Sequence, residues 1–169
     1  MRLRKKNNSL VNELDNHHAY NNHDLPPKKR LSNRRTKPEI NNPTVMIGRE
    51  RVFFIERVLN KSDMDKGQNR LSMPCNQVRV RGFFTSEEMD KLWASSSSYV
   101  DAKMIDPRGE EYEIKLNVRK SGTNTYSYAF GKPWNEVNDD NGFRVGTVLK
   151  VWARRGEAGK PCFVLEKSG

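Results

Sequence analysis

The uneven distribution of large apolar side chains is the feature that most constrains the fold of this chain. All three Trp, all seven Phe and four of the five Tyr lie in residues 51–169, whereas residues 1–50 are almost entirely polar. A core must therefore be built from the second segment alone, and about 120 residues are enough to bury one. We predict a single domain over residues 45–169, preceded by a disordered basic tail over residues 1–44.

The charge balance restricts the partners of the chain. It carries 31 Lys and Arg against 21 Asp and Glu, a net charge of +10. An excess of positive charge favours a polyanionic partner through long-range attraction and counterion release. No apolar run approaches the roughly 20 residues of a membrane span, and no apolar signal region follows the start. We expect a soluble intracellular protein without a membrane partner.

The tail contains basic clusters that follow prolines in a polar, Asn-rich sequence. Nuclear import receptors recognise short Lys/Arg clusters of this kind in an extended chain. We therefore predict localisation in the nucleus, with an import receptor as partner; the alternative is a solvated tail that adds nonspecific charge. The predicted import residues are Lys28, Lys29, Arg30, Arg34 and Arg35.

The pattern in residues 51–169 is typical of short β-strands. Residues 52–59 begin with a β-branched and aromatic run, and residues 99–105 and 111–118 flank a turn, 106–109, with Pro and Gly at positions that suit type I. In the second arm of that hairpin apolar and polar residues alternate, which buries one face. Further strands are predicted at residues 70–74, 126–130, 147–153 and 162–165.

Two short helices are predicted between the strands. Thr85 and Glu88 form a capping-box pattern that begins a helix ending near Trp93. Pro133 suits the start of a second helix, which we expect to continue through Val137 and to be closed by the turn residues Asn141 and Gly142. The fold class is therefore mainly β with two short helices, and seven short strands without a long βαβ unit indicate a small antiparallel barrel or sandwich.

Four short motifs, taken in their order along the chain, resemble those of a known family. They are LNKSD at 59–63, NRLSMP at 69–74, Gly131 with Trp134, and GTVL at 146–149. In order and spacing they resemble the plant-specific B3 DNA-binding domain of auxin response factors and abscisic-acid-insensitive regulators, most closely a little-studied plant subgroup. The resemblance covers about residues 50–167. It implies a seven-stranded open pseudo-barrel that acts in transcription regulation.

The resemblance also implies two arms that grip the major groove of double-stranded DNA. They correspond to residues 60–70 and 119–125, the two polar loops that composition alone identifies. Cations would contact phosphates, hydroxyls would donate to phosphate oxygens, and carboxamides and arginines would form paired hydrogen bonds with base edges. Asp63 is left out of this set, because a carboxylate beside phosphate is repelled and we expect it to cap the loop backbone. The predicted DNA-binding residues are Lys61, Ser62, Lys66, Gln68, Asn69, Arg70, Arg119, Lys120, Ser121, Thr123 and Asn124.

The main alternative is a protein-interaction module that kept the fold and lost sequence-specific DNA binding. Two departures from the family motivate it. Cys75 stands where the family often has a basic residue, and the second arm, NVRKS at 117–121, lacks the tryptophan that many members carry. Single-stranded nucleic acid is disfavoured because the aromatic residues follow strand alternation and should be buried. Gly131, Trp134, Trp152 and Phe163 are interpreted as core positions.

Catalysis and cofactors are not predicted. A D…E-x-K pattern like that of metal-dependent nucleases is formed by Asp106, Glu113 and Lys115. However, charged residues on the solvent-exposed face of a hairpin are common. A metal site formed by His17, His18 and His23 lacks supporting ligands in the sequence. The two cysteines, Cys75 and Cys162, cannot form a zinc site alone, and we expect two half-buried thiols.

Overall fold

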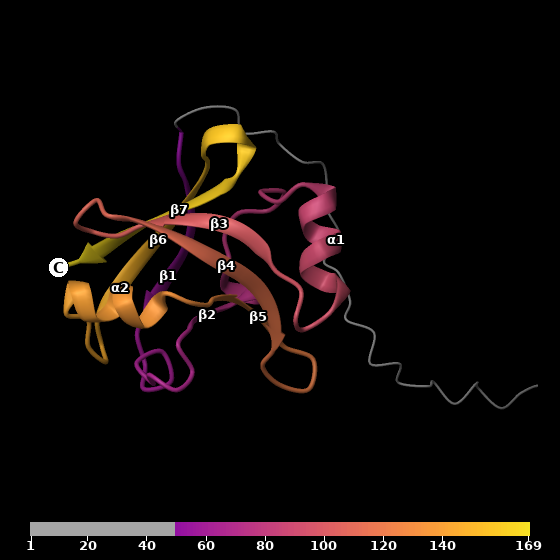
Figure 1. Ribbon diagram of the computed structural model, residues 1–169. Coiled ribbons are helices and arrows are strands. Elements are labelled where there is room, and N and C mark those ends of the chain that lie inside the picture. The colour runs from indigo at the N-terminus through magenta and orange to yellow at the C-terminus, as the bar shows by residue number, and fades with distance from the viewer. Residues whose placement is uncertain (1–49) are drawn as a thin grey trace, which may run out of the picture. The chain divides into compact units, whose positions relative to one another are not determined.

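The computed structural model describes residues 50–169, which fold around one curled β-sheet (Figure 1). The strand order in the sheet is β1-β6-β7-β3-β4-β5-β2. The number of strands agrees with the prediction, and each predicted strand is present. The bounds are β1 (Val52–Val58), β2 (Leu71–Pro74), β3 (Val100–Ile105), β4 (Glu111–Lys120), β5 (Tyr126–Phe130), β6 (Val148–Arg155) and β7 (Pro161–Ser168).

The sheet closes almost completely on itself. Its strand pairs are antiparallel except for β3 and β7, which run parallel. The two end strands, β1 and β2, do not form a ladder with each other. Instead, the backbone N–H of Arg79, in the segment after β2, donates to the carbonyl oxygen of Phe54 in β1 at 2.8 Å. The predicted open pseudo-barrel is therefore confirmed.

Helices α1 (Ser86–Ala94) and α2 (Trp134–Asn141) lie at different places on the barrel, on the right and at the lower left of Figure 1. The predicted capping box is present, because Thr85 Oγ1 accepts the N–H of Glu88 and the Glu88 carboxylate accepts the N–H of Thr85. Helix α2 extends four residues beyond its predicted end at Val137 and terminates at Gly142, which adopts a left-handed conformation. Short 3₁₀ turns occupy Cys75–Gln77 and Glu157–Gly159.

The core is aromatic and lies inside the barrel. Phe163 is fully buried, and its ring centroid lies 5.2 Å from that of Phe54 and 4.9 Å from that of Phe130. β4 alternates between buried and exposed residues as predicted. β5, between β4 and β2, does not alternate in this way, because it is buried on both faces at its C-terminal end.

One predicted core residue lies outside the barrel. Trp152 shares a strand with inward-pointing Leu149, Val151 and Ala153, but its position gives it the opposite face of β6. There it is half-buried, with its ring edge-on to Phe53 at a centroid distance of 5.4 Å. The interpretation of Trp152 as a core residue was therefore wrong. Side chains alternate between the two faces of a strand, and this alternation places Trp152 on the outer face although the residue is apolar.

The predicted tail, residues 1–44, lies outside the described residues, as do the predicted import cluster and the three histidines. Within residues 50–169, neither helix is long and apolar enough to cross a membrane.

Candidate functional site

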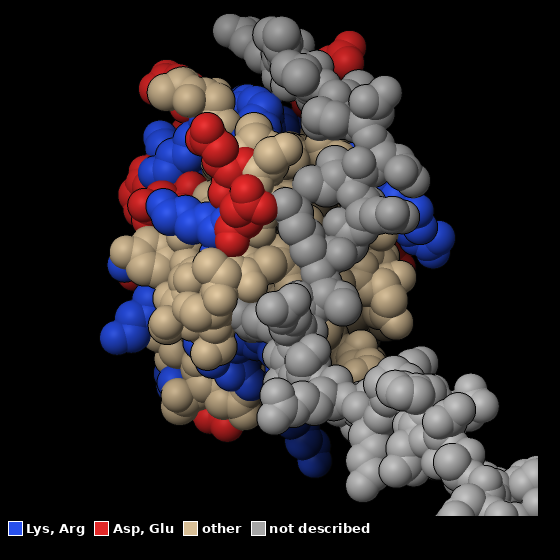
Figure 2. All heavy atoms as spheres, turned by 90° about the vertical axis from the view of Figure 1, so that its right-hand side faces the viewer, with Lys and Arg blue, Asp and Glu red and all other residues tan. Residues whose placement is uncertain are grey.

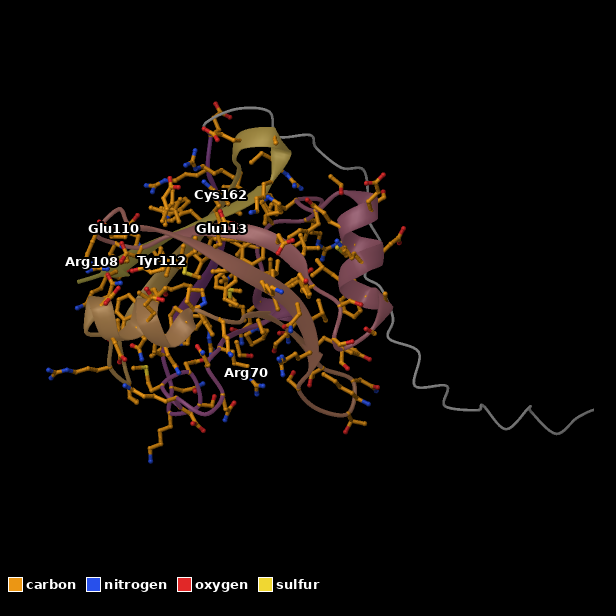
Figure 3. The ribbon with its side chains drawn as sticks, in the orientation of Figure 1. Arg70, Arg108, Glu110, Tyr112, Glu113 and Cys162 are labelled. Atoms are coloured by element: carbon orange, nitrogen blue, oxygen red, sulfur yellow. The ribbon has the colours of Figure 1, made fainter. Side chains whose placement is uncertain are left out.

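The two predicted arms emerge from the same end of the barrel. The first is the loop between β1 and β2, residues 59–70, and the second is the loop between β4 and β5, residues 121–125. Both project toward the bottom of Figure 1. Arg70, the last residue of the first loop, lies between them in Figure 3. Two segments that are far apart in the sequence are thus placed where one extended ligand can meet both.

The first arm is organised by the buried carboxylate of Asp63. Its Oδ2 accepts two hydrogen bonds, one from the backbone N–H of Asn60 at 3.1 Å and one from Arg57 Nη2 at 3.0 Å. Its Oδ1 accepts the backbone N–H of Ser72, in β2, at 3.2 Å. Because one carboxylate binds both ends of the loop, it fixes the loop on the barrel. The prediction that Asp63 caps the backbone is confirmed, and the residue is only 1% exposed.

Local hydrogen bonds fold the tip of the first arm into tight turns. Asn60 Oδ1 accepts the backbone N–H of Ser62 at 2.8 Å and the Ser62 hydroxyl at 2.7 Å. Asp65 accepts the backbone N–H of Gln68 through its carbonyl at 3.0 Å and the Gln68 carboxamide through its carboxylate at 3.3 Å. Ser62 and Gln68 therefore already donate within the loop and are not the free donors that their sequence pattern predicts.

Helix α2 holds the first arm from the side. Trp134 Nε1 donates to the carbonyl oxygen of Asp63 at 2.7 Å, the Asn135 N–H donates to Asn69 Oδ1 at 2.8 Å, and Asn135 Nδ2 donates to the carbonyl oxygen of Lys66 at 2.8 Å. Asn69 was predicted to read base edges. Its side-chain oxygen accepts the Asn135 N–H, and its backbone is left-handed with φ 42°. Asn69 therefore supports the arm, and its role in base reading stays a prediction.

The second arm is shorter than predicted and is closed by local bonds. Arg119 and Lys120 belong to the end of β4 rather than to the loop, opposite Ser127 and Tyr126 of β5. The Ser121 N–H donates to the carbonyl oxygen of Thr125 at 2.8 Å. The predicted contact residues of this arm are all exposed, and they are Arg119, Lys120, Ser121, Thr123 and Asn124.

Three cations of the arms have side chains without a partner. Within residues 50–169, no side-chain hydrogen bond or ion pair engages Lys61, Arg70 or Lys120, and the same holds for exposed cations elsewhere on the barrel, such as Lys91 and Lys167. Lys66 forms an exposed ion pair with Asp139 of α2 at 3.0 Å, and Arg119 Nε donates to a neighbouring carboxamide at 3.4 Å. On the face shown in Figure 2, acidic side chains gather in the upper part, and basic ones are more prominent below.

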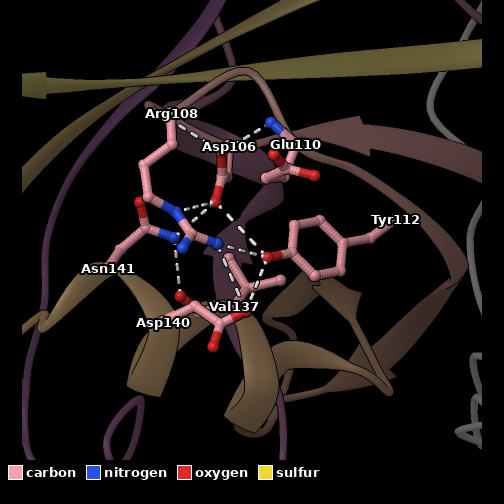
Figure 4. Close-up of polar contacts among 7 residues, drawn as sticks. All are labelled: Asp106, Arg108, Glu110, Tyr112, Val137, Asp140 and Asn141. Carbon is pink, nitrogen blue, oxygen red and sulfur yellow. Dashed lines mark hydrogen bonds and ion pairs between the residues drawn. The ribbon is translucent and has the colours of Figure 1, made fainter.

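Asp106, the first residue of the D…E-x-K pattern, is an internal hub of the β3–β4 turn (Figure 4). Its carboxylate accepts five hydrogen bonds, from Arg108 N, Arg108 Nε, Glu110 N, Tyr112 OH and Asn141 Nδ2. Burial alone would raise the pKa of Asp106, but these hydrogen bonds outweigh it and hold that pKa below its usual range. Burial and a hydrogen bond to Asp140 raise the pKa of Tyr112 to about 12.

The other two members of that pattern are engaged elsewhere. Glu113 forms an ion pair with Lys160, and the Lys115 ammonium lies 3.9 Å from the ring centroid of Tyr99. The structure therefore does not bring the three groups around one position. Among the described residues, no three His, Cys, Asp or Glu side chains are grouped so as to hold a metal ion.

Cys75, the departure from the family at the end of β2, is half-buried and free. Burial raises the pKa of its thiol to about 11, so at neutral pH the residue is uncharged. Cys162 is free as well, but it is buried rather than half-buried as predicted.

Seven strands in one curled sheet, with two polar loops at one end, define a small open β-barrel with paired arms. The sequence model of the family described as B3 domain-containing protein At2g31720-like matches residues 40–169. The chain therefore belongs to this family, and the resemblance inferred from the sequence is confirmed.

Curated relatives from Arabidopsis thaliana agree with this assignment. B3 domain-containing protein At2g32645 is 35% identical over 116 residues, which cover 64% of this chain and 61% of that protein. B3 domain-containing protein At2g31720 is 31% identical over 112 residues, which cover 63% of this chain and 36% of that protein. The matched region thus spans less than two thirds of the length of these relatives.

Two solved structures are also similar to the chain. The structure titled Arabidopsis FUS3-DNA complex has a TM-score of 0.45 at 12% identity and covers 70% of this chain and 100% of its own. The Arabidopsis thaliana transcription factor LEC2-DNA complex has a TM-score of 0.47 at 14% identity and covers 71% of this chain and 97% of its own.

Proposed function

We propose that the barrel binds double-stranded DNA, with both arms entering the major groove, and that the protein acts as a transcriptional regulator. The observation that carries the proposal is that two polar loops project from one end of the barrel, with the unpartnered side chains of Lys61 and Arg70 on the first loop and that of Lys120 where β4 enters the second. Membership in the B3 family supports it, because the arms coincide with the loops that the family resemblance assigns to DNA. A cation without an internal partner is free to replace a condensed counterion on a phosphate.

Different residues of the two arms would provide affinity and sequence specificity. Lys61, Lys66 and Lys120 are suited to phosphate oxygens, which set register and affinity without reading sequence. Arg70 and Arg119 are suited to either role. Gln68 and Asn124 retain carboxamide groups at exposed positions, and each paired bond with a base edge contributes about 1–3 kcal/mol of discrimination. Thr123 adds an exposed hydroxyl, whereas Ser62 and Ser121 would exchange their bonds to Asn60 and Thr125 for bonds to phosphate oxygens.

A selection experiment tests the proposal as a whole. The full chain is incubated with a randomised duplex pool, and enrichment is repeated at low and at physiological salt. We expect a motif that persists at physiological salt, because base contacts do not depend on counterion release. Retention without enrichment, abolished as salt rises, would contradict base reading and favour the protein-interaction module instead.

Charge reversal tests the two arms separately. We expect Arg70→Glu, and the pair Arg119→Glu and Lys120→Glu, to weaken binding and to reduce the slope of log K against log salt by about 0.9 for each phosphate that is no longer neutralised. The matched controls reverse exposed cations away from the arms, Lys167 on β7 alone or with Lys91 on α1. Unchanged affinity in both arm variants, or equal losses in the controls, would refute the two-arm arrangement.

The nuclear part of the proposal depends on the tail, which lies outside the described residues. Replacing Lys28, Lys29, Arg30, Arg34 and Arg35 with alanine should abolish nuclear accumulation of the chain fused to a reporter too large to diffuse through pores. Nuclear accumulation of that variant at the wild-type level would contradict a role of this cluster in import.

The same geometry argues for a binding role rather than a catalytic one. Asp106 has its carboxylate lone pairs engaged by donors of its own turn and of α2, so it supports the β3–β4 turn. A nuclease function would require cleavage of DNA that a chelator abolishes and that Glu113→Ala removes. We expect no such cleavage.

A further inference from the structure

Helix α2 forms a platform against the side of the first arm. The contacts come from its N-terminal turn, where Trp134 and Asn135 donate three hydrogen bonds to Asp63, Lys66 and Asn69. These acceptors are spread across the loop between β1 and β2. Because the three bonds join segments separated by more than 60 positions in the sequence, they fix the arm relative to the barrel and not merely to its own turns.

The contacts of Asn135 are of a kind that sets orientation. Its backbone N–H and its Nδ2 donate to two different residues of the arm, each at 2.8 Å. Its Oδ1 is buried and has no hydrogen-bond partner among the described residues. The side chain therefore acts on the arm as a donor, and the opposite amide orientation would place its oxygen against the Lys66 carbonyl oxygen.

The rest of α2 is unsuited to contact DNA itself. Its exposed residues Glu136, Asp139 and Asp140 are acidic, and carboxylates beside phosphates are repelled. Asp139 already holds Lys66 in an ion pair. The helix can therefore affect recognition only through the loop that it holds.

We propose that Asn135 is a positioning residue for sequence reading: it orients the first arm so that the side chains around Lys66 to Arg70 meet base edges in register. The inference rests on the proposed function, since it concerns how the same arm reads DNA. Paired hydrogen bonds to bases require well-defined geometry, whereas attraction between cations and phosphates tolerates movement of the arm. Removal of the Asn135 carboxamide should therefore reduce specificity more than nonspecific affinity.

The chain offers a matched control on the same helix. Asn141 also donates from Nδ2 to two acceptors, Asp106 Oδ2 at 2.7 Å and the Val137 carbonyl oxygen at 2.8 Å. Its bonds support the β3–β4 turn and the helix itself, not the first arm. Asn141→Ala removes two side-chain bonds, whereas Asn135→Ala removes only the one to the Lys66 carbonyl oxygen and leaves the backbone N–H bond to Asn69. The control therefore removes the same group with at least as large a loss of bonds, and it reports what general destabilisation of α2 does to DNA binding.

The experiment compares the full-length wild type, Asn135→Ala and Asn141→Ala. For each protein, affinity for the selected motif and for an unrelated duplex is measured over a salt series, and folding is checked by thermal unfolding. We expect Asn135→Ala to lower the ratio of specific to nonspecific affinity about tenfold, the value of one weak paired base contact. The slope of log K against log salt should stay unchanged, because every phosphate contact is retained. Asn141→Ala should keep the wild-type ratio.

Three results would overturn the inference: an unchanged ratio in Asn135→Ala, an equal fall in Asn141→Ala, or a fall in the salt slope of Asn135→Ala by about 0.9, which would mean that one phosphate is no longer neutralised. Asn135→Leu, which keeps the approximate shape of the side chain, gives the same test if the alanine variant does not fold. If the wild type enriches no motif, the proposed function itself fails, and that outcome is distinct from enrichment in the wild type with no effect of Asn135.

Discussion

Replacement of Asp63 with alanine should destabilise the domain more than any single change at the arm surface. The Asp63 side chain is 1% exposed, and that of its partner Arg57 is 14% exposed. The substitution removes the only carboxylate that joins Asn60, Arg57 and Ser72 in the described part of the chain. It leaves a largely buried guanidinium and two backbone N–H groups without their acceptor.

The magnitude follows from this burial. Removal of one partner from a buried ion pair typically costs about 3–5 kcal/mol, because the remaining charge is left uncompensated. This range already includes most of the cost to the backbone donors, so we do not add them. For a domain of this size the expected fall in the midpoint of thermal unfolding is roughly 10–20 °C.

Urea unfolding of the full chain measures the change, and a double-mutant cycle isolates the pair. Arg57→Met alone leaves Asp63 with its two backbone donors, and the double variant Arg57→Met with Asp63→Ala leaves no uncompensated charge. We expect the double variant to be more stable than the sum of the two single losses predicts. A destabilisation below about 1 kcal/mol in Asp63→Ala, as for an exposed pair, would refute the argument that this carboxylate holds the arm.

Three further changes test other parts of the structure. Asp106→Asn should destabilise the domain at neutral pH. Because the folded pKa of Asp106 is lowered, the stability that its charge supplies is present above the unfolded pKa of about 4 and is lost as pH falls through the folded pKa, so urea unfolding of wild type and variant should converge in acid. Asp139→Asn breaks an exposed ion pair with Lys66 and should change stability by less than about 1 kcal/mol, while DNA affinity rises in a binding titration because Lys66 is released. Gly142→Ala should cost about 1 kcal/mol in thermal unfolding, since φ is 58° but an added Cβ meets no atom within 4 Å.

Local sequence patterns predicted the elements of the fold because each pattern acts within a few residues. The Thr85–Glu88 capping box is a contact between positions three apart, and it formed as expected. The alternation in β4 placed Ile114, Leu116 and Val118 inside the barrel, since period two fixes the face of each side chain. The closing residue of α2, Gly142, was predicted, but the helical turn before it was missed because the residues after Val137 are polar. They continue the helix through contacts that lie outside the local pattern, such as that from Asn141 to Asp106.

The supporting residues of the site were not predicted for a related reason. Asn69 and Asn135 contact each other across 66 positions, and nothing in the residues around either one indicates the other. From the sequence, Asn69 is simply one more carboxamide in a polar loop, which is why it was assigned to base reading. One weak signal was present, since Trp134, which the sequence assigned to the core, lies next to Asn135 and places the start of α2 against the barrel. A single sequence does not reveal which loop that end of the helix contacts.

The two arms are held by different means, and this difference has a consequence for recognition. The first arm is fixed by a buried carboxylate and by three hydrogen bonds from α2, whereas the second is closed by bonds within its own hairpin, such as that from the Ser121 N–H to the Thr125 carbonyl oxygen. An arm fixed to the barrel loses little conformational entropy on binding, but an exposed hairpin loop loses more when it is ordered. We therefore expect the first arm to define the register of the protein on DNA and the second to adjust to it. Substitution of Asn135, which holds the first arm, should accordingly alter the bases read by that arm and leave those read by the second unchanged.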